Sequence, residues 1–178
     1  LDDAVVFFPR YERRFIIELA QGNWIDQHLN TLVLGPTGSG KSFLSCALGL
    51  SACRTNHSVR YFRTSRLLFQ LAQSHLDSSF PSLLARLAKL DLLILDDWMR
   101  DPFSASETRD LLEILDDRFG RVSTLVASQV PVGEWFSRFP DPTHADAILD
   151  RVIHNAYRLN LTGDSQRKVR SPIPMSST

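Results

Sequence analysis

Residues 35–42 of the chain read GPTGSGKS and fit the phosphate-loop pattern G-x-x-x-x-G-K-[ST]. Its glycines let the backbone fold tightly, so that several N–H groups and the positive end of a following helix face an anion. Lys41 would neutralise the β- and γ-phosphates of a nucleotide, and the Ser42 hydroxyl would ligate Mg²⁺. The alternative is a glycine turn that binds nothing. The predicted cradle consists of Gly35, Pro36, Thr37, Gly38, Ser39, Gly40, Lys41 and Ser42.

Two carboxylates follow an apolar run, because Asp96 and Asp97 come directly after Leu92–Leu95. Ligands bind at the carboxyl ends of the strands in α/β sheets, which is where these acids would lie. We expect Asp96 to hold the Mg²⁺ shell and Asp97 to orient an attacking water. Two acids in a solvated loop are the alternative.

Ser128 and Gln129 follow a second apolar run, over residues 123–127. Either side chain could hydrogen-bond the γ-phosphate or the water that attacks it, and Gln129 has the longer reach. The alternative is a polar turn that leads to Pro131. We therefore expect a catalytic contribution from Gln129 or Ser128.

Arg151 follows Asp150 in a helical pattern over residues 146–155. As an arginine finger it would enter the nucleotide site of a neighbouring subunit and stabilise the charge that develops in the transition state. A surface ion pair is the alternative, since such pairs are common on solvated helices. The finger role requires an oligomer.

Short apolar runs alternate with longer helical patterns, which predicts βαβ units and a parallel sheet with helices on both faces. Ser104 and Glu107 have the spacing of a capping box at the start of one helix. The predicted strands are 31–35, 59–62, 91–96, 123–127 and 157–161. The predicted helices are 9–22, 41–53, 66–75, 81–90, 104–119 and 146–155.

The composition is that of one ordinary globular domain: 178 residues, 43% hydrophobic, 22% charged and with zero net charge. This balance excludes a protein that binds nucleic acid through its overall field. The longest apolar runs, such as Val5–Phe8, are far shorter than the roughly 20 residues that span a bilayer. Cys46 and Cys53 are interpreted as small buried residues in a reducing cytoplasm.

A basic zone extends between Asp26 and Asp77, where no acid occurs. Within it Arg60, Arg63 and Arg66 alternate with aromatic and hydroxyl residues, and arginine is well suited to contacts with DNA phosphates. Strand alternation places Arg60 and Arg63 on opposite faces, so the three arginines cannot all serve one patch. A structural strand whose arginines extend into solvent is the alternative.

The chain resembles the AAA+ ATPases and, among them, the IstB-type transposition helpers, which are related to the DnaC helicase loaders. It differs from the usual family pattern at Met99, where a small residue is common. The resemblance covers nearly the whole chain and is carried by GPTGSGKS at 35–42, SVRYFRTSRLL at 58–68, LDLLILDDW at 90–98, RDLLEILDDRFG at 109–120, STLVASQVP at 123–131 and DPTHADAILDRVIHNAYRLNLTGDSQRK at 141–168.

The resemblance implies an α/β fold, a three-layer α-β-α P-loop NTPase with a five-stranded parallel sheet in 5-1-4-3-2 order and no C-terminal lid domain. It also implies ATP and Mg²⁺ as cofactors, self-assembly, binding to duplex DNA, a partner transposase like IstA, and the bacterial cytoplasm. The family's functional positions match Lys41 and Ser42 in Walker A, Asp96 and Asp97 in Walker B, Gln129 or Ser128 at sensor 1, and Arg151 as the arginine finger.

Three segments are expected along the chain. Residues 1–22 are interpreted as an N-terminal helix that remains from a missing N-terminal domain, and residues 23–170 as the ATPase domain. Residues 171–178 are rich in proline and serine and are expected to form a disordered tail.

The function predicted from these features is ATP-dependent assembly on duplex DNA, with hydrolysis regulating target selection and transposase recruitment. A helicase loader of the DnaC type would use the same chemistry on another client. A nucleotide-gated DNA-binding module with little turnover is a further alternative. A monomeric small-molecule kinase built on a phosphate loop is the last, and it would need neither DNA nor self-association.

Overall fold

The computed structural model describes residues 10–162, with side chains from residue 13 onward. Its centre is a five-stranded parallel sheet with the strand order β2-β3-β4-β1-β5. Read from the other edge, this is the predicted order 5-1-4-3-2, which is therefore confirmed. The strands are β1 (Asn30–Leu34), β2 (Val59–Arg63), β3 (Leu92–Asp96), β4 (Ser123–Ser128) and β5 (Ala156–Asn160).

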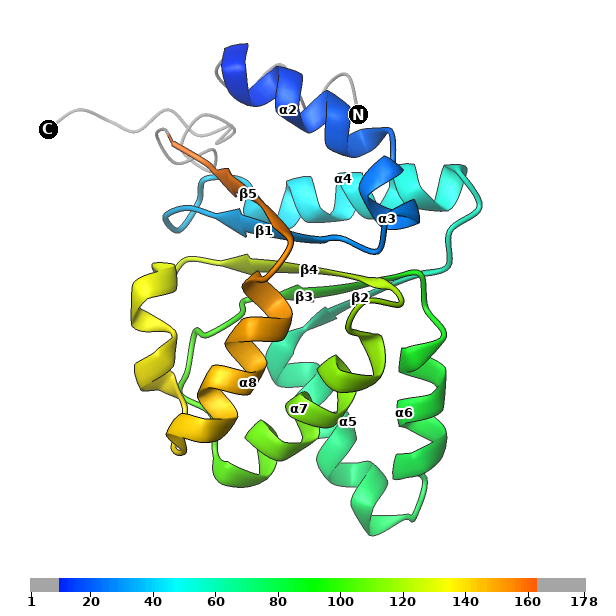
Figure 1. Ribbon diagram of the computed structural model, residues 1–178, viewed down its shortest axis with the longest axis vertical. Coiled ribbons are helices and arrows are strands. Elements are labelled where there is room, and N and C mark those ends of the chain that lie inside the picture. The colour runs from blue at the N-terminus through cyan, green and yellow to red at the C-terminus, as the bar shows by residue number, and fades with distance from the viewer. Residues whose placement is uncertain (1–9, 163–178) are drawn as a thin grey trace, which may run out of the picture.

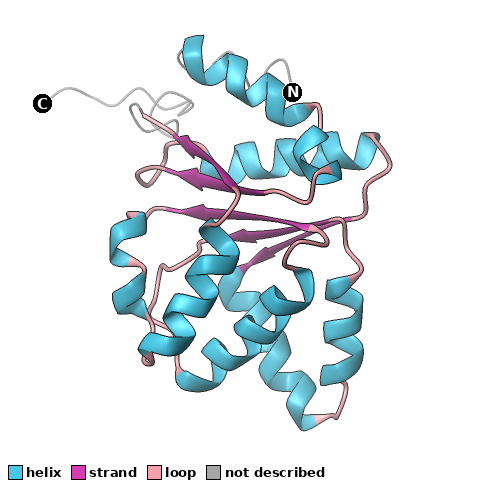
Figure 2. Ribbon diagram, viewed as in Figure 1, coloured by secondary structure: helices cyan, strands magenta, loops and turns pink. Residues whose placement is uncertain are grey.

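Helices cover both faces of the sheet and complete a three-layer α/β/α architecture (Figure 1). Helices α2, α3 and α4 lie on one face and α5 to α8 on the other, and Figure 2 shows the sheet between these two layers. None of the helices within residues 10–162 has the length and apolarity to cross a membrane. The helices are α2 (Arg10–Ala20), α3 (Asn23–Asp26), α4 (Lys41–Arg54), α5 (Thr64–Leu76), α6 (Phe80–Ala88), α7 (Ala105–Arg118) and α8 (Pro142–Ile153), with the short 3₁₀ helices η1 (Val132–Glu134) and η2 (Phe136–Arg138).

The central strands β3 and β4 are buried at every position. Their side chains alternate between two cores because successive residues of a strand point to opposite faces. Leu93 and Leu95 of β3 join the core beneath α5 to α8, whereas Leu92 and Ile94 join the core beneath α4. A strand covered on both faces needs a nearly continuous apolar run, and this explains the sequence DLLILD.

Helix α7 begins with the predicted capping box. The Ser104 hydroxyl accepts the Glu107 backbone N–H at 3.3 Å, and the Glu107 carboxylate accepts the Ser104 N–H at 2.8 Å. Two N–H groups that the helix itself cannot satisfy are thus paired at the helix start. This local prediction is confirmed.

The other end of α7 is anchored by Arg118, which is 1% exposed. Its guanidinium donates to the carbonyl oxygens of Leu87, Leu90 and Ser123 and to Thr124 Oγ1. These acceptors lie before β3 and at the start of β4, so one side chain connects α7 to the amino-terminal ends of these two strands. Burial lowers the pKa of Arg118 to about 10.

The expectation for the two cysteines is wrong, since Cys46 and Cys53 are both exposed. Helix α4 buries a different stripe, formed by Leu44, Ser45, Leu48, Gly49 and Ala52. Apolar residues lie on all sides of this helix, so its sequence periodicity does not show which side faces the sheet.

Helix α2 packs against α4. Ile16 and Leu19 of α2 are buried in the same core as Leu44, and the Ser51 hydroxyl donates to the Ala20 carbonyl oxygen at 2.9 Å. The domain boundary at residue 22 stays a prediction. The predicted tail at residues 171–178, together with the last part of the predicted ATPase domain, lies outside the described residues.

Candidate nucleotide-binding site

The phosphate loop connects the carboxyl end of β1 to the start of α4, as its sequence predicts. A Cβ atom on Gly35 would lie 2.7 Å from the Leu161 carbonyl oxygen and 2.8 Å from Ser39 Oγ, so no side chain fits there. Gly38 and Gly40 have φ angles of 83° and 95°, in the left-handed region that glycine tolerates without strain. The loop therefore requires its glycines.

Lys41 is the first residue of α4, and its Nζ donates to the carbonyl oxygens of Gly35 and Pro36 at 2.8 Å each. Its ammonium group thus lies within the curve of the loop. Gly40 precedes the helix and provides no side-chain cap, which leaves the first N–H groups of α4 to be satisfied by other partners. Ser42 is exposed in the same turn.

Asp96 ends β3 and is 2% exposed. Its Oδ2 accepts a hydrogen bond from the Tyr61 hydroxyl at 2.6 Å, and its Oδ1 accepts the Asp97 backbone N–H at 2.9 Å. The Thr64 hydroxyl donates to the Asp96 carbonyl oxygen at 2.8 Å. Both the carboxylate and the end of its strand are therefore held by specific partners.

Asp97 has a different environment from Asp96. It is half-buried and has a φ of 56°, and its Oδ2 lies 3.8 Å from Arg100 Nη1. Met99, two residues further along, is fully buried with a φ of 61°. This conformation is uncommon for residues with a side chain, and the loop after β3 adopts it twice.

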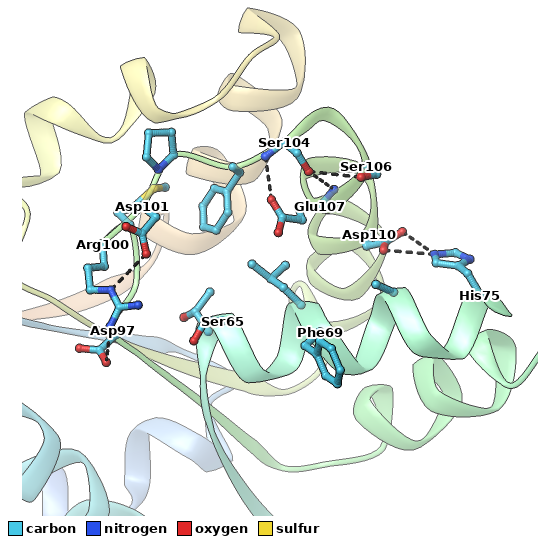
Figure 3. A pocket seen from close by; sticks show the side chains of 16 residues that line it. Ser65, Phe69, His75, Asp97, Arg100, Asp101, Ser104, Ser106, Glu107 and Asp110 are labelled. Carbon is cyan, nitrogen blue, oxygen red and sulfur yellow. Dashed lines mark hydrogen bonds and ion pairs between the residues drawn. The ribbon is translucent and has the colours of Figure 1, made fainter. Parts of the chain in front are cut away.

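Asp97 borders a pocket of about 600 Å³ between α5 and the β3–α7 connection (Figure 3). The wall on the α5 side includes Phe69, and the opposite side carries the Arg100–Asp101 ion pair. His75 pairs with Asp110 at the far end. None of the phosphate-loop residues lines this pocket, so it is separate from the nucleotide cradle.

Gln129 lies beside the phosphate loop, where its Oε1 accepts a hydrogen bond from the Thr37 hydroxyl. Ser128 is fully buried, and its hydroxyl donates to the Trp98 carbonyl oxygen at 2.6 Å and accepts the Val130 N–H at 3.1 Å. Ser128 and Gln129 therefore make different kinds of contact. Ser128 holds the backbone, and Gln129 presents an exposed amide to the loop.

Arg151 lies at the opposite end of the strands, where β1 begins. Its carbonyl oxygen accepts Asn30 Nδ2 at 2.8 Å, and Asn30 is the first residue of β1, whereas the phosphate loop follows the last. The five residues of β1 span about 16 Å. The Arg151 guanidinium pairs with Asp116 and lies 6.0 Å from the ring centre of Phe119.

The three candidate DNA-contacting arginines are all exposed. Arg60 lies over the Phe62 ring at 5.9 Å, while Arg63 is close enough to Tyr61 to influence its hydroxyl. These contacts agree with the predicted alternation along β2, with Arg60 on the side of Phe62 and Arg63 on the side of Tyr61. Arg66 lies in the first turn of α5.

Tyr61 is a site residue that the sequence analysis did not assign. Partial burial, followed by the hydrogen bond to Asp96 and its charge, raises the pKa of Tyr61 above its usual range. Partial burial, and then the charge of Asp96, also raises the pKa of Cys46. Cys46 is one turn beyond Ser42, so the charge of Asp96 acts on this side of α4. The alternation of β2 hints at Tyr61, but only the pairing of β2 with β3 brings it to Asp96.

The described residues contain no group of three or more His, Cys, Asp or Glu side chains that could hold a metal by themselves. Ser42 and Asp96 instead provide a hydroxyl and a carboxylate, hard oxygen donors of the kind that Mg²⁺ takes together with nucleotide phosphates. The donor set therefore fits a metal bound with a nucleotide.

Residues 5–172 match the family of IstB-like ATP binding proteins. An insertion sequence ATP-binding protein of Sinorhizobium fredii is 48% identical over 172 residues, which cover 96% of this chain and 69% of that protein. The IS21 ATP-binding protein of Pseudomonas aeruginosa is 31% identical over 161 residues, which cover 90% and 61%. The chain spans 55% to 69% of the length of the first relatives.

Solved structures with the same fold include the DnaC helicase loader and DnaI. The DnaC structure has a TM-score of 0.73 at 16% identity, over 84% of this chain and 88% of that one. DnaI has a TM-score of 0.71 at 21% identity, over 85% of both chains. These likenesses show the fold, a parallel α/β sheet of the P-loop NTPase type. The family match and the relatives from insertion sequences show that the chain belongs to the IstB-like ATP binding proteins.

Proposed function

We propose that the chain is the ATPase of a transposition system, which assembles with copies of itself on duplex DNA when it binds Mg²⁺-ATP. Hydrolysis then regulates target selection and the recruitment of a transposase of the IstA type. The observation that carries the proposal is the placement of the phosphate loop and Arg151 at opposite ends of strand β1.

The nucleotide phosphates would bind in the loop between β1 and α4. Backbone N–H groups of the loop and of the first turn of α4 would face the phosphate oxygens, aided by the helix dipole. The Lys41 ammonium already lies within the loop, where it would exchange carbonyl partners for phosphate oxygens. The loop therefore provides the main part of the binding energy for the phosphates.

The metal would be held by Ser42 and Asp96 together with phosphate oxygens. When bound, Mg²⁺ neutralises charge on the phosphates. Asp97 would orient the attacking water, which requires its carboxylate to exchange the contact with Arg100 for one with water. Gln129, held against the loop by Thr37, would position that water or the γ-phosphate.

Arg151 would complete the site of a neighbouring subunit. Its backbone lies at the amino-terminal end of β1, away from the loop of its own chain, and we therefore expect its guanidinium to act on a second copy. In the isolated chain Asp116 pairs with it. An interface that contains ATP would offer stronger phosphate partners and would lose them after hydrolysis, which couples assembly to the nucleotide state.

The test is the mass of the protein by light scattering with ATP, with ADP and without nucleotide, each with and without duplex DNA at a fixed salt concentration. We expect a large species with ATP and DNA. The variant Lys41→Ala should stay small because it loses the main phosphate contact. A monomer under all conditions, with hydrolysis that needs no DNA, would instead support a monomeric kinase or hydrolase.

A further inference from the structure

The Tyr61 side chain connects the edge strand β2 to the predicted metal ligand. Tyr61 lies beside Ile94 in the parallel pairing of β2 with β3, and Arg63 lies beside Asp96. From this register the phenol extends along the sheet to Asp96, where its hydroxyl donates to Oδ2 at 2.6 Å. No phosphate-loop residue makes this contact.

The contact has the properties of a strong hydrogen bond. A carboxylate that is 2% exposed has lost most of its water and needs replacement partners. An O–H donor to a carboxylate oxygen at 2.5–2.7 Å is a charge-assisted bond, about twice as strong as a neutral one. The phenol occupies one side of Oδ2, and the Asp97 N–H occupies one side of Oδ1. Lone pairs on both oxygens remain for a further ligand.

We propose that Tyr61 is a positioning residue for the magnesium site. Its hydroxyl fixes the rotation of the Asp96 carboxylate, so that the remaining lone pairs stay available to a metal that Ser42 also binds. Without the phenol, the carboxylate has one fixed oxygen and can turn about its last bond. This inference rests on the proposed function, because it assigns Asp96 to the metal.

The test is the Mg²⁺ dependence of nucleotide binding by the full chain, followed with a fluorescent ATP analogue. Tyr61→Phe keeps the ring and removes only the hydroxyl. We expect it to raise the Mg²⁺ concentration for half-maximal nucleotide affinity by about 10-fold, as for other residues that orient metal ligands. Affinity measured in the presence of a chelator should stay unchanged, since the phenol does not touch the phosphate loop.

Tyr157→Phe is the matched control. It makes the same chemical change on β5, where the ring packs edge-on against Phe15 and the hydroxyl has no hydrogen-bond partner among the described residues. We expect its Mg²⁺ requirement to equal that of the wild type. Thermal unfolding of both variants checks that the fold is retained.

An unchanged Mg²⁺ requirement in Tyr61→Phe would overturn the proposal, and a lower requirement would show that the phenol competes with the metal. Equal loss of affinity with and without Mg²⁺ would also contradict it, because the defect would then lie in the phosphate loop. Failure of the proposed function is a separate result: the wild type itself would bind the analogue without any response to Mg²⁺.

Discussion

The Thr37 hydroxyl donates a hydrogen bond to Gln129 Oε1, across 92 positions of sequence. The bond joins the phosphate loop to the end of β4, so the glutamine amide is oriented before any phosphate binds. Its amide N–H₂ group is left to point away from Thr37, since the oxygen is the atom engaged.

Replacing Gln129 tests its role in the chemical step. We expect Gln129→Ala to lower the rate of ATP hydrolysis by about 100-fold, the typical loss for one oriented donor, with little change in ATP affinity. Thr37→Val should lower the rate less, and Thr37→Ser should retain it, because serine keeps the hydroxyl. Steady-state turnover and nucleotide titration separate the two effects. A parallel loss of affinity would mean that Gln129 supports the loop and not the reaction.

Arg151 can be tested by mixing two inactive variants. We expect Arg151→Ala to reduce turnover by about 1000-fold, the lower range for an arginine finger, and to retain ATP binding. A Lys41→Ala subunit retains Arg151 but cannot bind a nucleotide in its own phosphate loop. If Arg151 acts on a neighbour, a mixture of the two variants regains measurable hydrolysis. No recovery in assemblies that contain both chains would place the arginine's effect within its own subunit.

The three arginines of β2 and α5 give a prediction about DNA. Among Arg60, Arg63 and Arg66, an arginine that contacts DNA phosphates should on change to alanine weaken duplex binding for all sequences alike and reduce the slope of log affinity against log salt by about 1. Arg121, exposed between α7 and β4, is the control position. Titrations over a range of salt concentrations measure the slope. Since Arg60 and Arg63 occupy opposite faces, we expect the slope to fall when one of them is replaced and to stay unchanged when the other is.

Arg118 should be more important for stability than any surface charge. Arg118→Ala would remove the donor from three buried hydrogen bonds and one part-buried one and create a cavity, at a cost of about 3 kcal/mol or more in the free energy of unfolding. Urea denaturation measures this loss. The exposed control Arg121→Ala should change the free energy by less than about 0.5 kcal/mol. Similar values for the two variants would contradict the assigned role.

Asp91 gives the protein a specific acid sensitivity. The Ser58 hydroxyl and N–H both donate to Asp91 Oδ2 at 2.7 Å, which lowers the pKa of Asp91 below its ordinary value of 3.8. As the pH falls, the Asp91 carboxylate therefore takes up a proton in the unfolded chain before it does so in the folded one. Its contribution to the free energy of unfolding is present above pH 3.8 and is lost as the pH falls through the folded-state pKa.

Ser58→Ala tests this linkage through unfolding free energies measured between neutral and acidic pH. We expect the wild type to be more stable than the variant at neutral pH and the difference to shrink at low pH. The control is the same comparison in an Asp91→Asn background. Because asparagine cannot ionise, the loss of unfolding free energy caused by Ser58→Ala should there be independent of pH. A difference that is independent of pH would show that the bonds do not favour the charged carboxylate.

The sequence by itself determined the features that depend on neighbouring residues. The phosphate loop occupies eight consecutive positions, and its glycines have the local backbone geometry that the motif requires. The capping box of α7 spans four residues, and the alternation of β2 follows from strand geometry alone. The order of the strands came from the family resemblance, because periodicity does not say which strands pair.

Tertiary structure alone decided which distant groups meet. The contacts of Tyr61 with Asp96 and of Thr37 with Gln129 join residues 35 and 92 positions apart, and they depend on strand register. It also decided that Ser128 is buried while Gln129 faces the loop, and that α4 turns its cysteines to solvent. An apolar pattern indicates that a face is buried, but the identity of the surface that covers it depends on the packing of the whole chain.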